Sequence, residues 1–389
     1  MKRIIPIILL LSVLLSLSAC GQKAKEETRL LRIGVLEPLT GKYAKEGTRE
    51  TLGIQYANIT APTVQLGGKE YRVELMIKDN ASDPVQSAQA AQELVEAGCA
   101  VVLGSYGDEL SLASSDTFFA AGVPAITASG SDPAVTRGND HYFRINALPA
   151  FQGAILAGFA KRTLSVKSAY CLIQAGSDED AALLHSFRAA AEALELKVTA
   201  VEFPANNIDF SAYLTAAKEE GAGVIFAPCA IQYAQRLIEQ SELLEAPIPF
   251  LADQRWEDPA VLSALQEKDL KVYVSAYYAE GADSEFDSGF KEWLNSNSDA
   301  LLSNGGNDNV RPESVLGYDA YFTALSAAKA ANSADKADIL AILPSVTHTG
   351  VAGSCSFSED GDAVRSALWI KKANPKAESW SYAGSARAA

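Results

Sequence analysis

Two short polar stretches of the sequence directly follow apolar runs and could hold a small molecule. Residues Ala125–Thr136 read AITASGSDPAVT, and residues Gly104–Glu109 read GSYGDE. Serine hydroxyls both donate and accept hydrogen bonds, and free N–H groups at a helix start attract an anion. Both stretches could also be ordinary turns, because Asp132-Pro133 favours a bend. The chemistry they suggest is the binding of a charged or polar molecule.

Motifs for catalysis or metal binding are missing. His141, His185 and His348 are far apart, and the sequence contains no HExxH, GxSxG or GxxxxGK[ST] motif. Four cysteines follow the N-terminal segment without any CxxC pair, which disfavours a metal site. We therefore expect no enzyme activity, no cofactor and no metal. Free buried thiols are favoured over disulfides for these cysteines, which are Cys99, Cys171, Cys229 and Cys355.

Length and charge narrow the class of protein further. A chain of 389 residues with 48% hydrophobic residues predicts two domains with sizeable cores. The net charge of -15 argues against a nucleic-acid partner, because phosphates require clustered Lys and Arg.

The N-terminus has the pattern of an export signal. Met1–Arg3 is basic, Ile4–Leu17 is apolar, and the segment closes on Leu-Ser-Ala followed by Cys20. A cysteine after small residues resembles the bacterial lipobox, so residues 1–19 are predicted to be a signal peptide and Cys20 a lipidated residue on a tether spanning 20–29. The alternative is a transmembrane anchor, but the apolar run is shorter than the roughly 20 residues that a span needs. We expect an extracytoplasmic protein attached to the bacterial cell membrane through Cys20.

Strand and helix patterns alternate from residue 31 onward. Apolar runs at Leu31–Leu36 and Tyr71–Ile77 predict strands, and Pro84–Ala97 predicts a helix with Asp83 as its N-cap. The pattern restarts at Ala154–Arg162. Alternation of this kind predicts an α/β fold with two doubly wound parallel sheets, which bind ligands beyond the carboxyl ends of their strands.

Six segments in a fixed order carry a resemblance to a known family. They are Ile33–Gly47 (IGVLEPLTGKYAKEG), Lys78–Pro84 (KDNASDP), Val101–Ser115, Ile126–Thr136, Gly317–Ala320 (GYDA) and Gly350–Asp362 (GVAGSCSFSEDGD). With them the chain resembles the type I periplasmic solute-binding proteins, specifically the Leu/Ile/Val-binding family of ABC importers, from Leu31 to about Lys372.

The resemblance implies two lobes joined by three hinge crossovers. We expect lobe 1 to comprise residues 30–146 and 277–352, and lobe 2 residues 147–276 and 353–389, with crossovers near Asn146, Ala276 and Gly353. Ligand binding would close the lobes, and a membrane permease would recognise the closed monomer.

In the first lobe, the resemblance implies contacts to the carboxylate and ammonium of an amino acid. The expected residues are Tyr106, Asp108, Glu109, Ser129, Gly130 and Ser131. The family usually has Ser or Thr near Asp108 and Glu109. Asp108, if it points inward, would repel a carboxylate and favour an amine, but both acids could simply stabilise the helix start.

In the second lobe, the sequence departs from the family. Glu179 and Cys229 stand where aromatic residues are usual, whereas Asp253, followed by Gln254, keeps the position of the acid that meets the ammonium. Arg255 and Trp256 lie beside them, and further candidates to line the cleft are Tyr43, Glu46 and Tyr278. Because buried acids need partners, these departures predict a polar or amine-bearing solute rather than leucine.

We therefore expect a substrate-binding protein of an ABC importer that captures an amino acid or a similar small polar solute. The alternative is a ligand-sensing module of the same fold that feeds a signalling receptor. An enzyme on the same scaffold is a more distant alternative.

Overall fold

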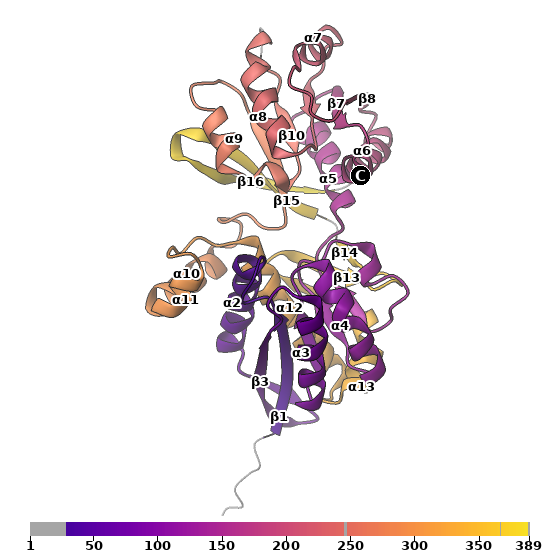
Figure 1. Cartoon of the computed structure of the whole chain (residues 1–389), viewed down its shortest axis with the longest axis vertical. Helices are drawn as coiled ribbons and strands as arrows, with labels where there is room; N and C mark the ends of the chain where they lie inside the picture. Colours follow the sequence, from indigo (N-terminus) through magenta and orange to yellow (C-terminus); the bar gives the residue numbers. More distant parts are fainter. Residues whose placement is uncertain (1–28, 245–246, 366, 388–389) are drawn as a thin grey trace, which may run out of the picture.

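The protein has two α/β lobes stacked along its long axis (Figure 1). The structure is a computed structural model, and it describes residues 29–244, 247–365 and 367–387. The predicted signal peptide and Cys20 lie outside the described residues. The expected fold class of two doubly wound lobes is confirmed.

The first lobe is built on a sheet with strand order β2-β3-β1-β4-β5-β6. All neighbours in it are parallel except the β2–β3 hairpin. Its strands are β1 (Arg29–Glu37), β2 (Thr63–Leu66), β3 (Lys69–Asp79), β4 (Val101–Gly104), β5 (Ala125–Thr127) and β6 (Tyr142–Arg144). Its helices are α2 (Ala44–Thr60), α3 (Pro84–Glu96), α4 (Asp108–Ala121), α10 (Ser284–Ser296), α11 (Ser298–Ser303), α12 (Pro312–Ala331) and α13 (Lys336–Ile342).

Helices cover both faces of this sheet because β1 is apolar on both sides. Leu31, Ile33 and Val35 share a core with α2 and α12, whereas Leu36 packs with α3 and α4. Asp83 caps α3 as predicted, since its carboxylate accepts from the N–H groups of Val85 and Gln86.

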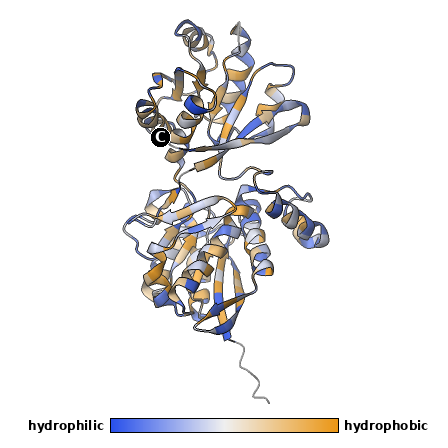
Figure 2. Ribbon diagram, turned by 180° about the vertical axis from the view of Figure 1, so that it is seen from behind, coloured by the Kyte–Doolittle hydropathy of each residue, from blue (hydrophilic) through white to orange (hydrophobic). Residues whose placement is uncertain are grey.

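The second lobe has the strand order β16-β15-β11-β10-β9-β7-β8. The five strands from β11 to β8 are parallel, and β15 and β16 add an antiparallel hairpin at the opposite edge that the sequence did not predict. The strands are β7 (Ser168–Gln174), β8 (Lys197–Phe203), β9 (Val224–Phe226), β10 (Phe250–Ala252), β11 (Val272–Ala276), β15 (Ala367–Asn374) and β16 (Ser379–Arg387). The helices are α5 (Pro149–Arg162), α6 (Asp178–Ala193), α7 (Ser211–Glu219), α8 (Ile231–Gln240) and α9 (Pro259–Ala264). Figure 2 shows mostly hydrophobic residues on the central strands of each lobe.

The third crossover lies later in the chain than expected. Around and after Gly353, a small sheet of β12 (His348–Gly350), β13 (Gly353–Phe357) and β14 (Ala363–Arg365) stays with the first lobe. The buried guanidinium of Arg144 holds it there, because its Nε donates to Asp362 Oδ1 at 2.9 Å. The chain therefore returns to the second lobe between β14 and β15.

The four cysteines within the described ranges are buried and free. Burial raises the pKa of each thiol, so these side chains act as small apolar residues in the cores. No helix of the described residues is long and apolar enough to cross a membrane.

Candidate functional site

A cavity of about 640 Å³ lies between the two lobes, at the carboxyl ends of both parallel sheets. This is the position at which α/β sheets bind ligands. Its lining comes from both lobes and is Lys45, Arg49, Tyr106, Ser129, Ser131, Asn146, Pro149, Gln152, Glu179, Asp253, Gln254, Arg255, Glu257, Asp258, Pro259, Tyr277, Arg311, Pro312, Glu313 and Leu316. Six of the predicted residues line it together, namely Tyr106, Ser129, Ser131, Glu179, Asp253 and Gln254. Their contact with a ligand stays a prediction.

The loop after β5 presents Ser129 and Ser131 to the cavity in a fixed arrangement. Asp108 accepts both the backbone N–H of Ser131, at 2.7 Å, and its hydroxyl, at 2.9 Å. The N–H of Gly130 donates to Thr127 Oγ1 at 3.0 Å. The loop is thus held in place before any ligand arrives, which lowers the entropy cost of binding.

Four predicted site residues do not line the cavity. Asp108 is engaged with Ser131, so it does not stand in the cavity as a free carboxylate. Gly130 is buried behind the loop, and Glu109 points to the surface, where it pairs with Lys42. Cys229 is buried in the second-lobe core, and its carbonyl accepts from the indole of Trp256 at 2.8 Å.

The further candidates also lie outside the lining. Tyr43 packs against Tyr106 with ring centroids 5.9 Å apart and donates to Glu109 at 2.6 Å. Tyr278 is buried and donates to Asp287 at 2.7 Å. Glu46 does not line the cavity.

Behind Ser129 lies a buried pair of acids that the sequence reasoning missed. Glu37 ends β1, Glu50 lies on α2, and both are fully buried. The Ser129 hydroxyl donates to Glu50, and Glu37 accepts from the N–H of Tyr106 at 2.9 Å. Burial raises the pKa of Glu37 and raises the pKa of Glu50 to about 7, and the charge of Glu50 raises the pKa of Glu37 further. Two neighbouring buried carboxyls resist double ionisation, so the pair retains a proton at pH values where exposed carboxyls are ionised.

The pair has a consequence for the orientation of the Ser129 hydroxyl. Its proton is directed to Glu50, so its oxygen is left to accept a hydrogen bond on the cavity side. The signal in the sequence was an acid at the end of an otherwise apolar strand, in the run IGVLE.

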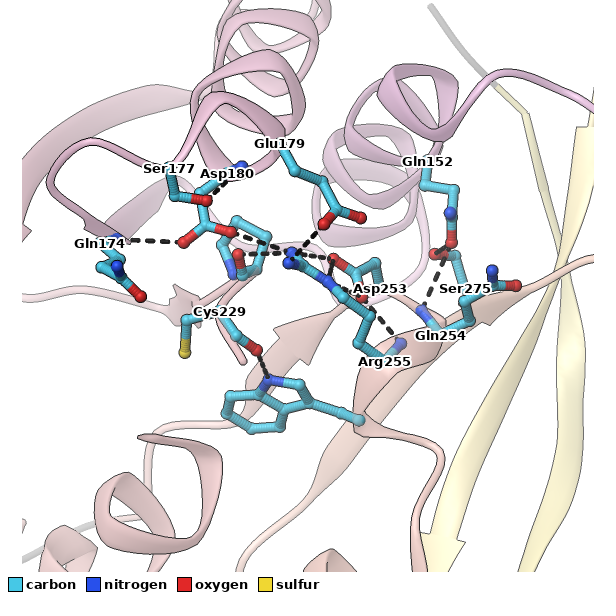
Figure 3. Close-up of polar contacts among 12 residues, drawn as sticks. Gln152, Gln174, Ser177, Glu179, Asp180, Cys229, Asp253, Gln254, Arg255 and Ser275 are labelled. Carbon is cyan, nitrogen blue, oxygen red and sulfur yellow. Dashed lines mark hydrogen bonds and ion pairs between the residues drawn. The ribbon is translucent and has the colours of Figure 1, made fainter. Parts of the chain in front are cut away.

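The second-lobe wall is organised around Arg255 (Figure 3). Its guanidinium contacts Asp253 at 2.7 Å, Glu179 at 2.9 Å and Asp180 at 3.1 Å. It also donates to the carbonyl of Pro228 at 2.7 Å. Asp253 and Asp180 are almost fully buried, so each needs this partner.

These contacts change what the second-lobe acids can do. Asp253 was expected to meet the ammonium of a ligand, but its carboxylate already holds Arg255 with both oxygens. Glu257 pairs with Lys371 at 2.7 Å, and Asp258 caps α9 through the N–H of Ala260 at 2.8 Å. The acids that line this wall therefore already have partners within the protein and do not require a cationic ligand.

The first-lobe wall contains basic residues that the sequence reasoning missed. Arg49 on α2 and Arg311, just before α12, both line the cavity together with Lys45. The side chains of Arg49 and Arg311 make no hydrogen bond or ion pair to another described residue, and the Nε of each is buried. These residues are remote in sequence, and only the packing of α2 against α12 brings them together.

Glycines allow these two helices to approach closely. A Cβ at Gly53 would lie 1.8 Å from the carbonyl oxygen of Ser314, and one at Gly317 would lie 2.2 Å from that of Glu50. The contact fixes the position of both helices, and with them the residues that line the cavity.

Residues at the crossovers between the lobes form the back of the cavity and are hydrogen-bonded to one another. The Tyr277 hydroxyl donates to the carbonyl of Ala147 at 3.1 Å, which ties two of the crossovers together. Gln152 accepts from Ser275 at 2.7 Å and from the N–H of Gln254 at 3.4 Å.

A family model described as periplasmic binding protein matches residues 31–378. The chain belongs to this periplasmic binding protein family. The Leu/Ile/Val-binding protein homolog 3 of Brucella melitensis is 28% identical over 200 residues, which cover 50% of this chain and 53% of that protein. The chain thus matches about half the length of this relative.

Solved structures share the fold over most of the chain. A leucine-binding protein of Thermotoga maritima MSB8 has a TM-score of 0.63 at 25% identity, covering 92% of this chain and 99% of that one. A solute-binding protein of an ABC transporter from Rhodopseudomonas palustris HaA2, in complex with p-hydroxybenzoic acid, has a TM-score of 0.66 at 20% identity, covering 92% and 97%. This periplasmic binding protein thus has the two-lobed fold of ABC-transporter solute-binding proteins.

Proposed function

We propose that the protein captures an amino acid or a similar small polar solute by lobe closure and delivers it to an ABC permease. The observation that carries the proposal is the polar cavity between the lobes, where Ser129, Ser131 and Tyr106 face Gln254 and the Arg255 cluster. Family membership supports a role in binding, and a relative named for Leu, Ile and Val supports the amino-acid class.

Calorimetric titration of the purified protein with the twenty amino acids and p-hydroxybenzoate tests the proposal. We expect at least one amino acid to bind with a micromolar Kd, and small-angle scattering to show a smaller radius of gyration after it binds. Ser129→Ala should weaken that binding about tenfold, because a hydroxyl that accepts from the ligand is lost. Ser303→Ala, on the exposed surface of α11, is the control. Binding of p-hydroxybenzoate without binding of any amino acid would contradict the proposed ligand class.

The proposal includes an extracytoplasmic location and a lipid anchor on Cys20, supported by the sequence of the N-terminal segment and by the family. Cys20→Ala should move the protein from the membrane fraction to the soluble fraction of the host cell and abolish labelling with a radioactive fatty acid. Retention of the label in this variant would reject the anchor.

A further inference from the structure

Among the described residues, the cavity has unpaired basic side chains on its first-lobe wall but not on its second-lobe wall. Arg255, on the second-lobe wall, is surrounded by carboxylates. The side chains of Arg49 and Arg311, on the first-lobe wall, have no hydrogen-bond or ion-pair partner within the ranges 29–244, 247–365 and 367–387. The first-lobe wall therefore carries positive charge that the protein itself does not neutralise.

Arg49 is too buried to be an ordinary surface arginine. Its relative exposure is 8%, and its Nε is shielded from solvent without an acceptor. A buried polar group without a partner costs free energy, and an ionised one costs more. Burial, together with the nearby charge of Arg311, lowers the pKa of Arg49 from its usual value. The guanidinium is therefore held at a position where an anion would be stabilised.

The two arginines cannot easily move apart to reach water. Arg49 is one turn before Gly53 on α2, and Arg311 immediately precedes Pro312, the first residue of α12. The glycine contacts described above clamp these two helices against each other. Both side chains therefore start from a rigid backbone, which is the arrangement expected of a binding site rather than of a mobile surface.

Among the acids, Glu313 comes closest to neutralising Arg49 and Arg311, but it neutralises their charge only in part. Its Oε2 is buried without a hydrogen-bond partner, and no ion pair joins it to Arg49 or Arg311 among the residues described. Burial raises the pKa of Glu313, because the low dielectric disfavours its charged form. Glu46 is a second acid whose charge acts on Arg49, so Glu313 and Glu46 stand against Arg49, Arg311 and Lys45, and the balance of charge stays positive.

We propose that Arg49 and Arg311 bind the additional, side-chain carboxylate of the ligand, and that the solute is an acidic amino acid or a comparable small dicarboxylate. This inference rests on the proposed function and deepens it. The planar fork of a guanidinium matches the two oxygens of a carboxylate, and two guanidiniums offer more donors than one carboxylate needs. Ser129, Ser131 and Tyr106 remain available for the other polar groups of the same molecule.

A second role for the two arginines would be to attract the acids of the opposite lobe during closure. Glu179 and Glu257 are already paired with Arg255 and Lys371, which disfavours this role. The two roles make different predictions, because an attraction between the lobes would strengthen the binding of every ligand equally. A carboxylate site would act only on ligands that carry the additional carboxylate.

Calorimetric titrations of the purified protein with L-glutamate, L-glutamine and glutarate separate these possibilities. We expect L-glutamate to bind at least tenfold more tightly than L-glutamine. Arg49→Gln and Arg311→Gln should each weaken glutamate at least tenfold and glutamine less than threefold. Arg49→Lys should give an intermediate loss, since it keeps the charge but loses the fork. Arg137→Gln, on an exposed residue outside the cavity, is the matched control and should change neither Kd.

The remaining outcomes distinguish this inference from the proposed function. Glutamine binding as tightly as glutamate, or equal weakening of both by Arg49→Gln, would overturn the carboxylate site and leave amino-acid binding intact. Binding of glutarate that depends on Arg49, without binding of any amino acid, would support the carboxylate site and reject the amino-acid class. Failure of both glutamate and glutarate to bind the folded protein, with circular dichroism unchanged, would overturn the inference.

Discussion

The two walls of the interlobe cavity use arginine in opposite ways. Arg255 on the second lobe is held by Asp253, Glu179 and Asp180, and this cluster is complete without a ligand. Among the described residues, the side chains of Arg49 and Arg311 on the first lobe have no such partners. An arginine surrounded by carboxylates shapes the wall of the site, whereas a buried and unneutralised one is available to an incoming anion. The same residue type thus serves structure on one lobe and recognition on the other.

The largest effect is expected from breaking the neutralised wall. Arg255→Met would leave Asp180 and Asp253 buried without their charge partner, so the free energy of unfolding should fall by about 3–5 kcal/mol. Urea denaturation followed by tryptophan fluorescence measures this loss. Arg32→Gln, which breaks a half-exposed pair with Glu74, is the control and should cost less than about 1 kcal/mol. Equal losses in the two variants would show that the Arg255 cluster is not needed for stability.

The next effect concerns the buried acids behind Ser129. Burial raises the pKa of Glu50 to about 7 from an ordinary value of 4.5. Between these pH values the folded protein holds a proton that the unfolded chain has lost, so stability falls as pH rises from 4.5 to about 7 and then levels off. The fall should amount to at most about 3 kcal/mol.

Glu50→Gln removes this ionisation and should flatten the pH dependence of stability. Urea denaturation of both proteins at several pH values across this window measures the difference. Glu109→Gln is a control, because Glu109 is exposed and its pKa is lowered by Tyr43. Parallel curves for the native protein and Glu50→Gln would show that the folded protein holds no extra proton on Glu50 in this pH window.

A smaller effect should follow from separating α2 from α12. A Cβ at Gly53 would clash with the backbone of Ser314, so Gly53→Ala should cost about 1–3 kcal/mol of stability. The same change should weaken glutamate more than glutamine, because it displaces Arg49 relative to Arg311. Ile59→Ala, on the exposed part of α2, should leave both properties nearly unchanged. Unaltered glutamate binding in folded Gly53→Ala would indicate that the helix contact does not position the arginines.

Local signals in the sequence predicted the framework and one part of the site. Alternating apolar strands and capped helices were enough to predict the α/β fold with two sheets, and the resemblance of Ile126–Thr136 to the family's segment placed Ser129 and Ser131 at the cavity. Both predictions depend on short stretches of sequence. The charge of the site could not be predicted in the same way. Asp108 looked free because its partner, Ser131, is 23 positions away in the chain.

The same limitation explains the residues that were missed. Arg49 and Arg311 lie in unrelated parts of the sequence and meet only through the packing of α2 and α12. The β15–β16 hairpin was missed because β16 is mostly exposed and carries few apolar residues, and because both strands follow a segment expected only to complete a crossover. Whether a charged side chain is paired is a property of the tertiary structure, so it has to be read from contacts.

The interleaved course of the chain has a consequence for the order in which the molecule can assemble during synthesis. The first sheet is complete at β6, yet the face covered by α12 waits for residues 312–331. The second sheet likewise waits for β15 and β16, although β7 to β11 are made long before. A ribosome that has produced the first 300 residues has therefore completed neither lobe. The two halves of the cavity become whole only when the final third of the chain folds back onto both of them.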